Sequence, residues 1–403
     1  MNSYDVIVVG AGPSGTISSY TLARLGFKVL LVDKERFPRY KPCGGALTLK
    51  TVRLLKHEGL FDDNMVESTN RFIDVYLRNE FVTTIELDAP IFIVDRAKFD
   101  FLLLKKAIDA GVTFHANEYA IKASYDPNKA YLLTSESSYT SEFIVGADGV
   151  NSKVALTSGL RDRWRMDEIG IASQTFLYTT TPKAARNTNI MLFFGYIPYG
   201  YGWVFPLSNK VNVGIGTRAE FSSLLLKIQS SFYKYIEKRI KGVTSMVIYH
   251  PLSLGTNSER VVAKGRILLV GDAAGLADPW SGEGVYYAIL SGLAAALVIG
   301  KHASCETPDL ASSSYNSLVR SILKELEYAV KISRLFYKSI NLSVRLLKKT
   351  DLFSNYLSML LSGRLSYSQL YRKLTNVFSL LLESNSPNFR KDIVLNPQLL
   401  TSR

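Results

Sequence analysis

Hydrophobic and polar residues follow three different patterns along the chain. Short runs rich in Val and Ile at 4–9 and 28–32 are typical of buried strands in a parallel sheet. At 71–94 and 174–217, apolar and polar residues alternate with aromatic side chains, which predicts antiparallel strands. From 328 to 403, apolar residues recur at helical spacing. We therefore expect an α/β protein with a Rossmann-type domain, an antiparallel-sheet domain and a helical C-terminal region.

The first strand leads directly into a glycine-rich loop, Gly10-Ala11-Gly12-Pro13-Ser14-Gly15. Gly10 allows a tight turn, Gly12 lets the backbone approach a pyrophosphate, and Gly15 lets the next helix pack closely on the strand. Ser14 lies at the start of that helix, whose N-terminus faces the anion. Asp33 ends the second strand, where it can accept a hydrogen bond from a ribose hydroxyl. The loop alone could be a structural turn, but in this context it predicts a dinucleotide site.

Two later turns also follow strand-like runs. They are Gly146-Ala147-Asp148-Gly149, after 142–145, and Gly271-Asp272-Ala273-Ala274-Gly275, after 267–270. Either turn alone could be an ordinary polar strand end. In this order after the first loop, they resemble the DG and GD motifs of flavoprotein hydroxylase-type enzymes. The resemblance implies that the cofactor is FAD, that Asp272 binds its ribityl chain and that Asp148 supports its pyrophosphate region.

A loop rich in small residues, 279–285, follows the second of these turns and leads into an alanine-rich helical run. Gly284 lets the backbone pass near an isoalloxazine ring, and Val285 stands at the helix start. The N-terminus of this helix would place N–H groups near the pyrimidine ring of the flavin, which favours the anionic reduced form.

Three further segments resemble motifs of the geranylgeranyl reductase family. Residues 41–47 are similar to its PCGGG-type signature, 201–206 to its YxWxFP motif, and 94–100 to its arginine-bearing helix start. The resemblance covers about residues 1–300. It implies further FAD contacts from Cys43, Gly44, Ala46, Arg96 and, on the adenine side, Ala120.

The resemblance also implies an activity, the saturation of isolated C=C bonds in geranylgeranyl chains of isoprenoid lipids, as in archaeal phospholipid maturation. Reduced FAD would deliver a hydride to one carbon, and an acid would protonate the other. An unactivated alkene has no carbonyl to polarise, so positioning and the exclusion of water must contribute most. The substrate head group, whether a phospholipid, a diphosphate, a quinone or a tetrapyrrole ester, stays open.

Two of these segments offer candidate chemistry in their own right. Cys43 lies on a rigid loop between Pro42 and Gly44, where its thiol could tune redox chemistry or donate the proton, although it could equally be a small buried hydrophobe. We expect it, or a water beside it, to be the proton donor. The aromatic segment, with Tyr201, Trp203, Phe205 and Pro206, could be plain sheet core, but we expect it to line an apolar substrate channel.

These motifs predict a discontinuous domain organisation. We assign 1–70, 96–160 and 258–300 to the FAD-binding domain. The antiparallel-sheet domain that encloses the substrate takes 71–95 and 161–257, and the remaining residues, 301–403, form the helical region.

The charge of the chain is unevenly distributed. Lys and Arg number 48 against 35 Asp and Glu, a formal net charge of +13. Residues 328–403 hold twelve basic and three acidic residues, which is most of this excess. A basic amphipathic region fits peripheral contact with anionic membrane lipid, although a helical cap with a solvated basic face explains the pattern nearly as well. Nucleic acid is not expected, because basic residues and aromatics do not cluster together near the flavin motifs.

Other features bear on the location of the protein and on metal binding. The two cysteines, Cys43 and Cys305, suggest no secreted framework and favour a reducing compartment. The N-terminus lacks the pattern of a signal peptide, and the longest apolar stretch, 289–300, is too short to span a membrane. We expect a cytoplasmic protein that lies peripherally on the membrane. The histidines are too scattered for a metal site, so none is expected.

The main alternative is an FAD-dependent monooxygenase or halogenase, because such enzymes share the FAD signatures. Halogenases carry a similar WxWxIP strand, but here Tyr201 replaces its first tryptophan and Phe205 its isoleucine, which favours the reductase. A lipid- or nucleic-acid-binding protein with a vestigial nucleotide fold is suggested only by the charge. The electron donor stays open between NAD(P)H, ferredoxin and a small reductant, because no second GxGxxG loop follows a strand.

Overall fold

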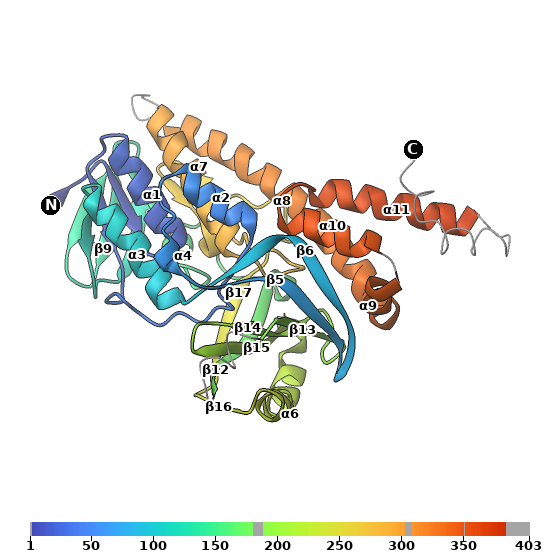
Figure 1. Cartoon of the computed structure of the whole chain (residues 1–403). Coiled ribbons are helices and arrows are strands. Elements are labelled where there is room, and N and C mark those ends of the chain that lie inside the picture. Colours follow the sequence, from blue (N-terminus) through green and yellow to red (C-terminus); the bar gives the residue numbers. More distant parts are fainter. Residues whose placement is uncertain (1, 180–187, 303–307, 350, 384–403) are drawn as a thin grey trace.

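The computed structural model describes residues 2–179, 188–302, 308–349 and 351–383. Figure 1 shows a parallel sheet with its helices, an antiparallel sheet beside it, and a group of C-terminal helices that spans the two. The expected α/β class, with an antiparallel sheet and a helical C-terminal region, is confirmed. Cys305 and the last twenty residues, with Arg390, Lys391 and Arg403, lie outside the described residues.

The first half is built on a six-stranded sheet in the order β18-β19-β11-β2-β3-β7. All neighbouring strands run parallel except the antiparallel edge pair β18 and β19. The four residues of β2 are at most 4% exposed, which explains why this strand reads as a continuous apolar run. In chain order the strands are β2 (Val6–Val9), β3 (Val29–Val32), β7 (Thr113–His115), β11 (Phe143–Gly146), β18 (Ala263–Lys264) and β19 (Ile267–Leu269).

Helices and a small second sheet complete this half. The helices are α1 (Pro13–Arg24), α2 (Leu49–His57), α3 (Arg96–Asp109), α4 (Lys153–Thr157) and α7 (Val285–His302). The small sheet contains β1 (Asn2–Ser3), β8 (Ala120–Tyr125), β9 (Ala130–Thr134) and β10 (Ser138–Ser141). Across both halves, short 3₁₀ helices lie at η1 (Asp63–Met65), η2 (Met166–Glu168), η3 (Ala219–Phe221) and η4 (Gly271–Ala273).

The second half is a nine-stranded, mainly antiparallel sheet in the order β16-β12-β15-β14-β13-β5-β6-β4, with β17 also paired to β12. Its strands are β4 (Ala46–Leu47), β5 (Val66–Leu77), β6 (Glu80–Val94), β12 (Ile169–Thr179), β13 (Ile190–Phe194), β14 (Tyr201–Pro206), β15 (Lys210–Arg218), β16 (Gly242–Thr244) and β17 (Ile248–Ser253). Helix α6 (Ser222–Ile240) covers one face through Leu225, Phe232 and Ile236, so the other face is left for a site.

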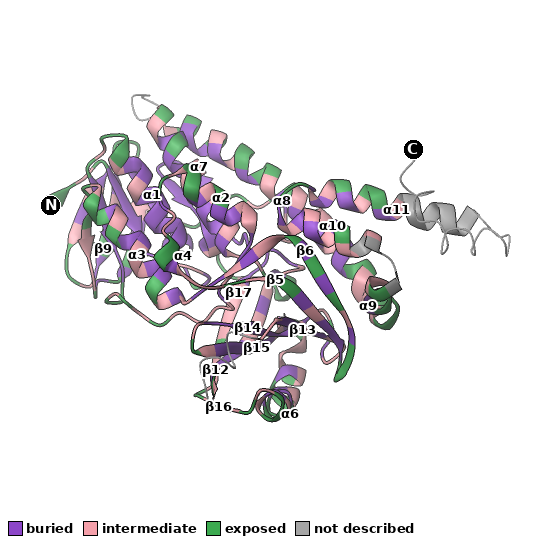
Figure 2. Ribbon diagram, in the orientation of Figure 1, coloured by how far each residue is buried: buried purple, intermediate pink, exposed green. Residues whose placement is uncertain are grey.

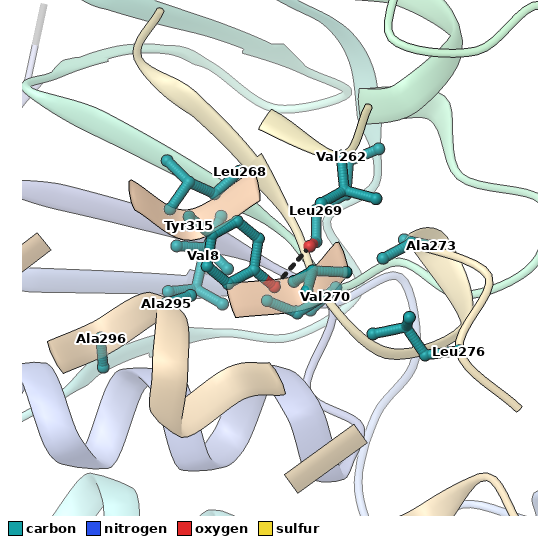
Figure 3. Packing of buried hydrophobic residues seen from close by; sticks show 14 of the residues in the cluster. Val8, Val262, Leu268, Leu269, Val270, Ala273, Leu276, Ala295, Ala296 and Tyr315 are labelled. Carbon is teal, nitrogen blue, oxygen red and sulfur yellow. Dashed lines mark hydrogen bonds between the residues drawn. The ribbon is translucent and has the colours of Figure 1, made fainter. Parts of the chain in front are cut away.

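The C-terminal helices are α8 (Pro308–Lys338), α9 (Ile340–Lys349), α10 (Asp351–Leu361) and α11 (Tyr367–Glu383). Helix α8 packs against the parallel sheet, where the Tyr315 hydroxyl donates to the Leu269 carbonyl at 2.8 Å (Figure 3). Helices α9 and α10 cover β6, and the fully buried Val344 joins the same core as Ile73 and Ile91. Figure 2 shows buried residues on these helices as well as in both sheets, so the C-terminal region is part of the packed protein.

By length and composition alone, helix α7 is long enough and apolar enough to cross a membrane. The helix is longer than the apolar run 289–300 on which the sequence-based expectation was based. However, 56% of this helix is buried inside the protein. It packs against α1 and α8, as expected of a core helix.

Candidate functional site

A cavity of about 1020 Å³ lies between the two sheets and the C-terminal helices. Nearly all residues singled out in the sequence line it: Gly10, Gly12, Ser14, Asp33, Cys43, Gly44, Ala46, Arg96, Ala120, Asp148, Tyr201, Trp203, Phe205, Asp272, Gly284 and Val285. Gly15 and Pro206 are not among the lining residues. The fold therefore gathers segments from distant parts of the chain around one space.

The glycine-rich loop between β2 and α1 combines tight packing with one open position. A Cβ on Gly10 would lie 2.4 Å from the Ala147 carbonyl oxygen, and one on Gly15 would lie 1.8 Å from that of Gly10. A Cβ on Gly12 would meet only an Arg39 nitrogen, at 3.9 Å. Gly10 and Gly15 thus maintain the turn, whereas Gly12 leaves room for a ligand at the N-terminus of α1, as a pyrophosphate requires.

Asp33 ties the end of β3 to this loop. Its carboxylate accepts the N–H of Ala11 at 2.6 Å and that of Glu35 at 2.8 Å. Burial raises the pKa of Asp33 above its usual value, and these two N–H donors oppose the rise. The side chain therefore holds the loop in place at the edge of the cavity.

The two later aspartates have different environments. Asp148 caps α4, accepting the N–H groups of Lys153 and Val154 at 2.7 and 3.1 Å. Asp272 lies in η4, and its carboxylate is 3.6 Å from where a Cβ on Gly284 would be. Burial raises the pKa of Asp272, and the positive charges of Lys41 and Arg96 oppose the rise. Asp272 thus faces the cavity beside the start of α7.

The loop that carries Cys43 is fixed to the antiparallel sheet through both the N–H and the carbonyl group of that residue. The Cys43 N–H donates to Gln174 Oε1 at 2.6 Å, and the Asn212 amide donates to the Cys43 carbonyl at 2.7 Å. Trp203 in turn donates its indole N–H to Asn212 at 3.0 Å. A Cβ on Gly44 would lie 2.7 Å from the Phe205 ring. These contacts hold the Cys43 loop, whose thiol is free and half-buried, against the antiparallel sheet.

Arg96 is oriented by an acidic partner on its own helix. Its guanidinium donates twice to Asp100, at 2.8 and 2.9 Å, and Arg39 lies 3.2 Å from the same carboxylate. Burial acts to lower the pKa of Arg96, but the Asp100 carboxylate and the Cys43 sulfur outweigh it and raise that pKa above its usual value. Arg96 is therefore a fixed cation next to Cys43.

The aromatic side chains of β14 form one wall of the cavity. The ring centres of Tyr201 and Trp203 are 6.1 Å apart, and those of Trp203 and Phe205 are 6.2 Å apart. Trp203 lies flat against Gly214, where a Cβ would be 2.1 Å from the indole. Pro206 does not share this wall; its carbonyl accepts the Ser68 hydroxyl. Aliphatic residues from three strands and one helix extend the wall: Ile73, Val75, Ile85, Ile91, Ile190, Leu192, Leu357 and Leu361.

Sequence reasoning missed a half-buried basic pair among the residues that line the cavity. Lys41 Nζ contacts Nε2 of His250, which comes from β17, more than two hundred positions later. Burial, together with the charge of Arg96, lowers the pKa of Lys41 to about 8. Burial and the Lys41 charge lower the pKa of His250 to about 3. No motif marks His250, and it comes near Lys41 only through the fold.

The loop before α7 is anchored by two acids that the sequence did not single out. Asp278 is fully buried and accepts the N–H of Trp280 at 2.8 Å and the hydroxyl of Tyr367 in α11. Glu283 pairs with Lys50 at 2.7 Å and accepts the Thr48 hydroxyl at the same distance. Helices α2 and α11 thereby fix the loop that ends at Gly284. Across the described ranges, no group of three or more His, Cys, Asp or Glu side chains could hold a metal ion.

Comparison with known proteins agrees with this geometry. Residues 3–317 match the FAD binding domain family. The chain is 31% identical to the geranylgeranyl diphosphate reductase of Rhodobacter capsulatus, with 73% of this chain and 74% of the relative covered. It is 30% identical to the digeranylgeranylglycerophospholipid reductase of Methanocaldococcus jannaschii, with coverage of 84% and 86%.

Solved structures show the same fold. A geranylgeranyl bacteriochlorophyll reductase-like protein from Thermoplasma acidophilum superposes with a TM-score of 0.76 at 20% identity, covering 89% of this chain and 96% of that one. The flavin-dependent brominase Bmp2 superposes with a TM-score of 0.71 at 20% identity, covering 90% and 94%. The fold is thus shared between reductases and halogenases, and the cofactor is FAD. From the sequence relatives, the chain belongs to the geranylgeranyl reductase family of FAD-dependent oxidoreductases.

Proposed function

We propose that this protein reduces C=C bonds in the geranylgeranyl chains of isoprenoid lipids. The observation that carries the proposal is the fixed Cys43 loop, which faces the aromatic strand and opens onto a cavity walled by aliphatic side chains. Such a space suits a long hydrocarbon chain and excludes water. The names of the two reductase relatives support the same substrate class.

We assign the FAD contacts to the residues around the open loop positions. Gly10, Gly12, Ser14 and Gly15 would form the cradle for the pyrophosphate, with Asp148 beside them and Asp33 toward the ribose. Arg96 and Ala120 would contact the cofactor farther along, and Asp272 would bind the ribityl chain. The isoalloxazine ring would lie between Cys43, Gly44 and Ala46 on one side and Gly284 and Val285 on the other.

The chain's own residues would position and protonate the alkene. When bound and reduced, FAD supplies the hydride. Tyr201, Trp203 and Phe205 would hold the prenyl chain flat against the reactive region, and the aliphatic walls would keep water away. The Cys43 thiol, held in place through its own backbone, would donate the proton to the second carbon.

An FAD-dependent monooxygenase or halogenase is the alternative function. The brominase fold supports it, because its likeness extends over most of both chains. Tyr201 and Phe205, at the positions where the halogenase strand has tryptophan and isoleucine, favour the reductase.

Product mass tests the proposal. The holoenzyme, chemically reduced without oxygen, is incubated with a geranylgeranylated lipid, and the product is weighed by mass spectrometry. We expect a gain of one pair of hydrogens for each bond reduced. A product that carries added oxygen or halogen, formed when air or halide is supplied, would establish the alternative instead.

We also propose that the C-terminal helices meet an anionic membrane surface, from which the lipid enters. Leu342 on α9 is 59% exposed, and the basic residues Arg345, Arg372 and Lys373 are exposed on α9 and α11. Basic residues near such a surface contribute about 1 kcal/mol each. Binding to vesicles that contain anionic lipid should fall as salt is raised; weak binding that salt does not change would contradict this contact.

A further inference from the structure

Arg218, at the end of β15, is a buried cation with free donors inside the cavity. It is 9% exposed and is one of the lining residues. Its Nε and Nη2 atoms are buried and have no hydrogen-bond partner within the described part of the chain. Its Nη1 lies 4.0 Å from Glu220, at the outer limit of an ion pair.

Such an arrangement is unfavourable unless a ligand completes it. A charged group taken out of water must find hydrogen-bond partners, and buried donors in native proteins are nearly always paired. Glu220 does little for Arg218, because its own side chain is 46% exposed and solvent screens its charge. The unpaired N–H groups on these two nitrogen atoms therefore point to an anion that is absent from the chain itself.

Two tyrosines shape the space around this guanidinium. Its central carbon lies 4.2 Å from the centre of the Tyr199 ring, which holds the planar group in place. The Tyr199 ring is 5.4 Å from that of Tyr337 on α8. Burial raises the pKa of Tyr337, so its hydroxyl stays a neutral donor. A guanidinium and a phenol are both donors that suit phosphate oxygens.

Arg218 lies at the far end of β15 from the residue that contacts the Cys43 loop. Asn212, on the same strand, contacts the Cys43 loop, and Arg218 lies six residues farther on, about 20 Å along the strand at the usual rise. Gly214 and Gly216 lie between them on the face that carries Trp203. The cavity thus has a cationic region at Arg218 and a mainly apolar region under α9 and α10.

We propose that Arg218 and Tyr337 form an anion subsite that selects prenyl substrates with a phosphate or diphosphate head group. The identity of the hydrocarbon part rests on the proposed function, whereas the anion site rests on Arg218 itself. The head group binds the guanidinium, and the chain runs past the aromatic wall into the mainly apolar region. Neutral prenyl alcohols or esters fill the same hydrocarbon space without this contact.

Ligand binding to the oxidised holoenzyme tests the subsite without turnover. Geranylgeranyl diphosphate, geranylgeranyl monophosphate and geranylgeraniol are titrated while flavin fluorescence is followed. We expect Arg218→Gln to weaken diphosphate binding by about 10- to 100-fold, the usual effect of losing hydrogen bonds to a charged group. Alcohol binding should change less than about twofold, because no such bond is lost. Diphosphate binding by Arg218→Lys should be intermediate between that of the unmodified protein and that of Arg218→Gln, because lysine keeps the charge but lacks the planar guanidinium.

Arg334→Gln is the matched control. Arg334 is exposed on α8, and its charge acts on Arg218 from a distance. Its removal should leave the preference for phosphate nearly unchanged, and FAD content and melting temperature confirm that each variant is folded.

Comparing monophosphate with diphosphate identifies the head group. The proposal is overturned if Arg218→Gln binds all three ligands as the unmodified protein does, or weakens all three equally. Failure of the reduced enzyme to hydrogenate any of them would count against the proposed function and leave this preference intact.

Discussion

The two sides of the cavity are built in different ways. On the parallel-sheet side, backbone turns at Gly10 and Gly12 shape the surface, and each turn is encoded by a few consecutive residues. On the antiparallel-sheet side, the surface consists of side chains, and Cys43 is held by Gln174 and Asn212 from two other strands. A backbone site needs only local sequence, whereas a side-chain site depends on the pairing of distant strands. Substitutions on the two sides of the cavity should therefore impair different properties of the protein.

Removing the open space at Gly12 should have the largest effect. In Gly12→Ala the added methyl meets little in the free protein but occupies space that the pyrophosphate needs, so FAD should be lost while the apoprotein stays as stable as before. Gly15→Ala is the contrasting variant, because its methyl would overlap the Gly10 carbonyl and lower the free energy of unfolding too. Flavin absorbance after purification and urea unfolding measure the two properties. Normal flavin content in Gly12→Ala would contradict the assignment.

Replacing the thiol on the opposite side should spare the cofactor and remove the chemistry. Cys43→Ala should retain FAD but reduce C=C bonds at least about 100-fold more slowly, the usual contribution of a positioned proton donor. Cys43→Ser, which supplies a hydroxyl of similar size, should recover part of this rate. Single-turnover rates with the reduced enzyme measure both. An unchanged rate in Cys43→Ala would remove the thiol from the mechanism.

Loosening the support of the Cys43 loop should have a smaller effect. Trp203→Phe keeps an aromatic ring in the wall but removes the indole N–H that donates to Asn212. Asn212 in turn donates to the Cys43 carbonyl, so the substitution weakens the support of the loop. We expect a loss of about 1 kcal/mol in the free energy of unfolding, as for one buried hydrogen bond, with a slower reduction and normal FAD content. Tyr131→Phe, in the small sheet, is a control for the general effect of changing an aromatic side chain, because the Tyr131 hydroxyl donates to Asp126 and neither residue lines the cavity. Equal slowing in both variants would argue against a specific role for Trp203.

A further effect concerns the pH dependence of stability in the apoprotein. The pKa of Lys41 is about 8 in the folded protein against an ordinary value of 10.5, so between these values the unfolded chain binds more protons. Stability relative to Lys41→Met should therefore rise as the pH rises through this range. His250 does not contribute there, because it is already neutral. Urea unfolding at several pH values measures the difference, and a flat or falling difference would contradict the lowered pKa of Lys41.

The same contrast explains what could be predicted from sequence. The Rossmann-type sheet, the loop at Gly10 and the aromatic strand at Tyr201 could be read locally, because each is a short pattern with a fixed period. His250 and Arg218 could not, because their roles arise only when β17 and β15 pair with β12 and bring them to the cavity. Pro206 was predicted to belong to the wall, but β-strand alternation would not place it on the face of Trp203 and Phe205. The hydrogen bond from Tyr367 of α11 to Asp278 could not be predicted from the sequence for the same reason.

Anaerobic reoxidation of the bound flavin tests the central claim most directly. The reduced holoenzyme is mixed with a geranylgeranylated lipid in the absence of oxygen and halide, and flavin absorbance is followed together with product mass. A fully saturated lipid of the same length is the control. The account predicts that the oxidised flavin spectrum returns only with the unsaturated lipid, and that the product gains one pair of hydrogens for each flavin reoxidised. A flavin that stays reduced with the unsaturated lipid, and is reoxidised only when oxygen is admitted, would contradict it.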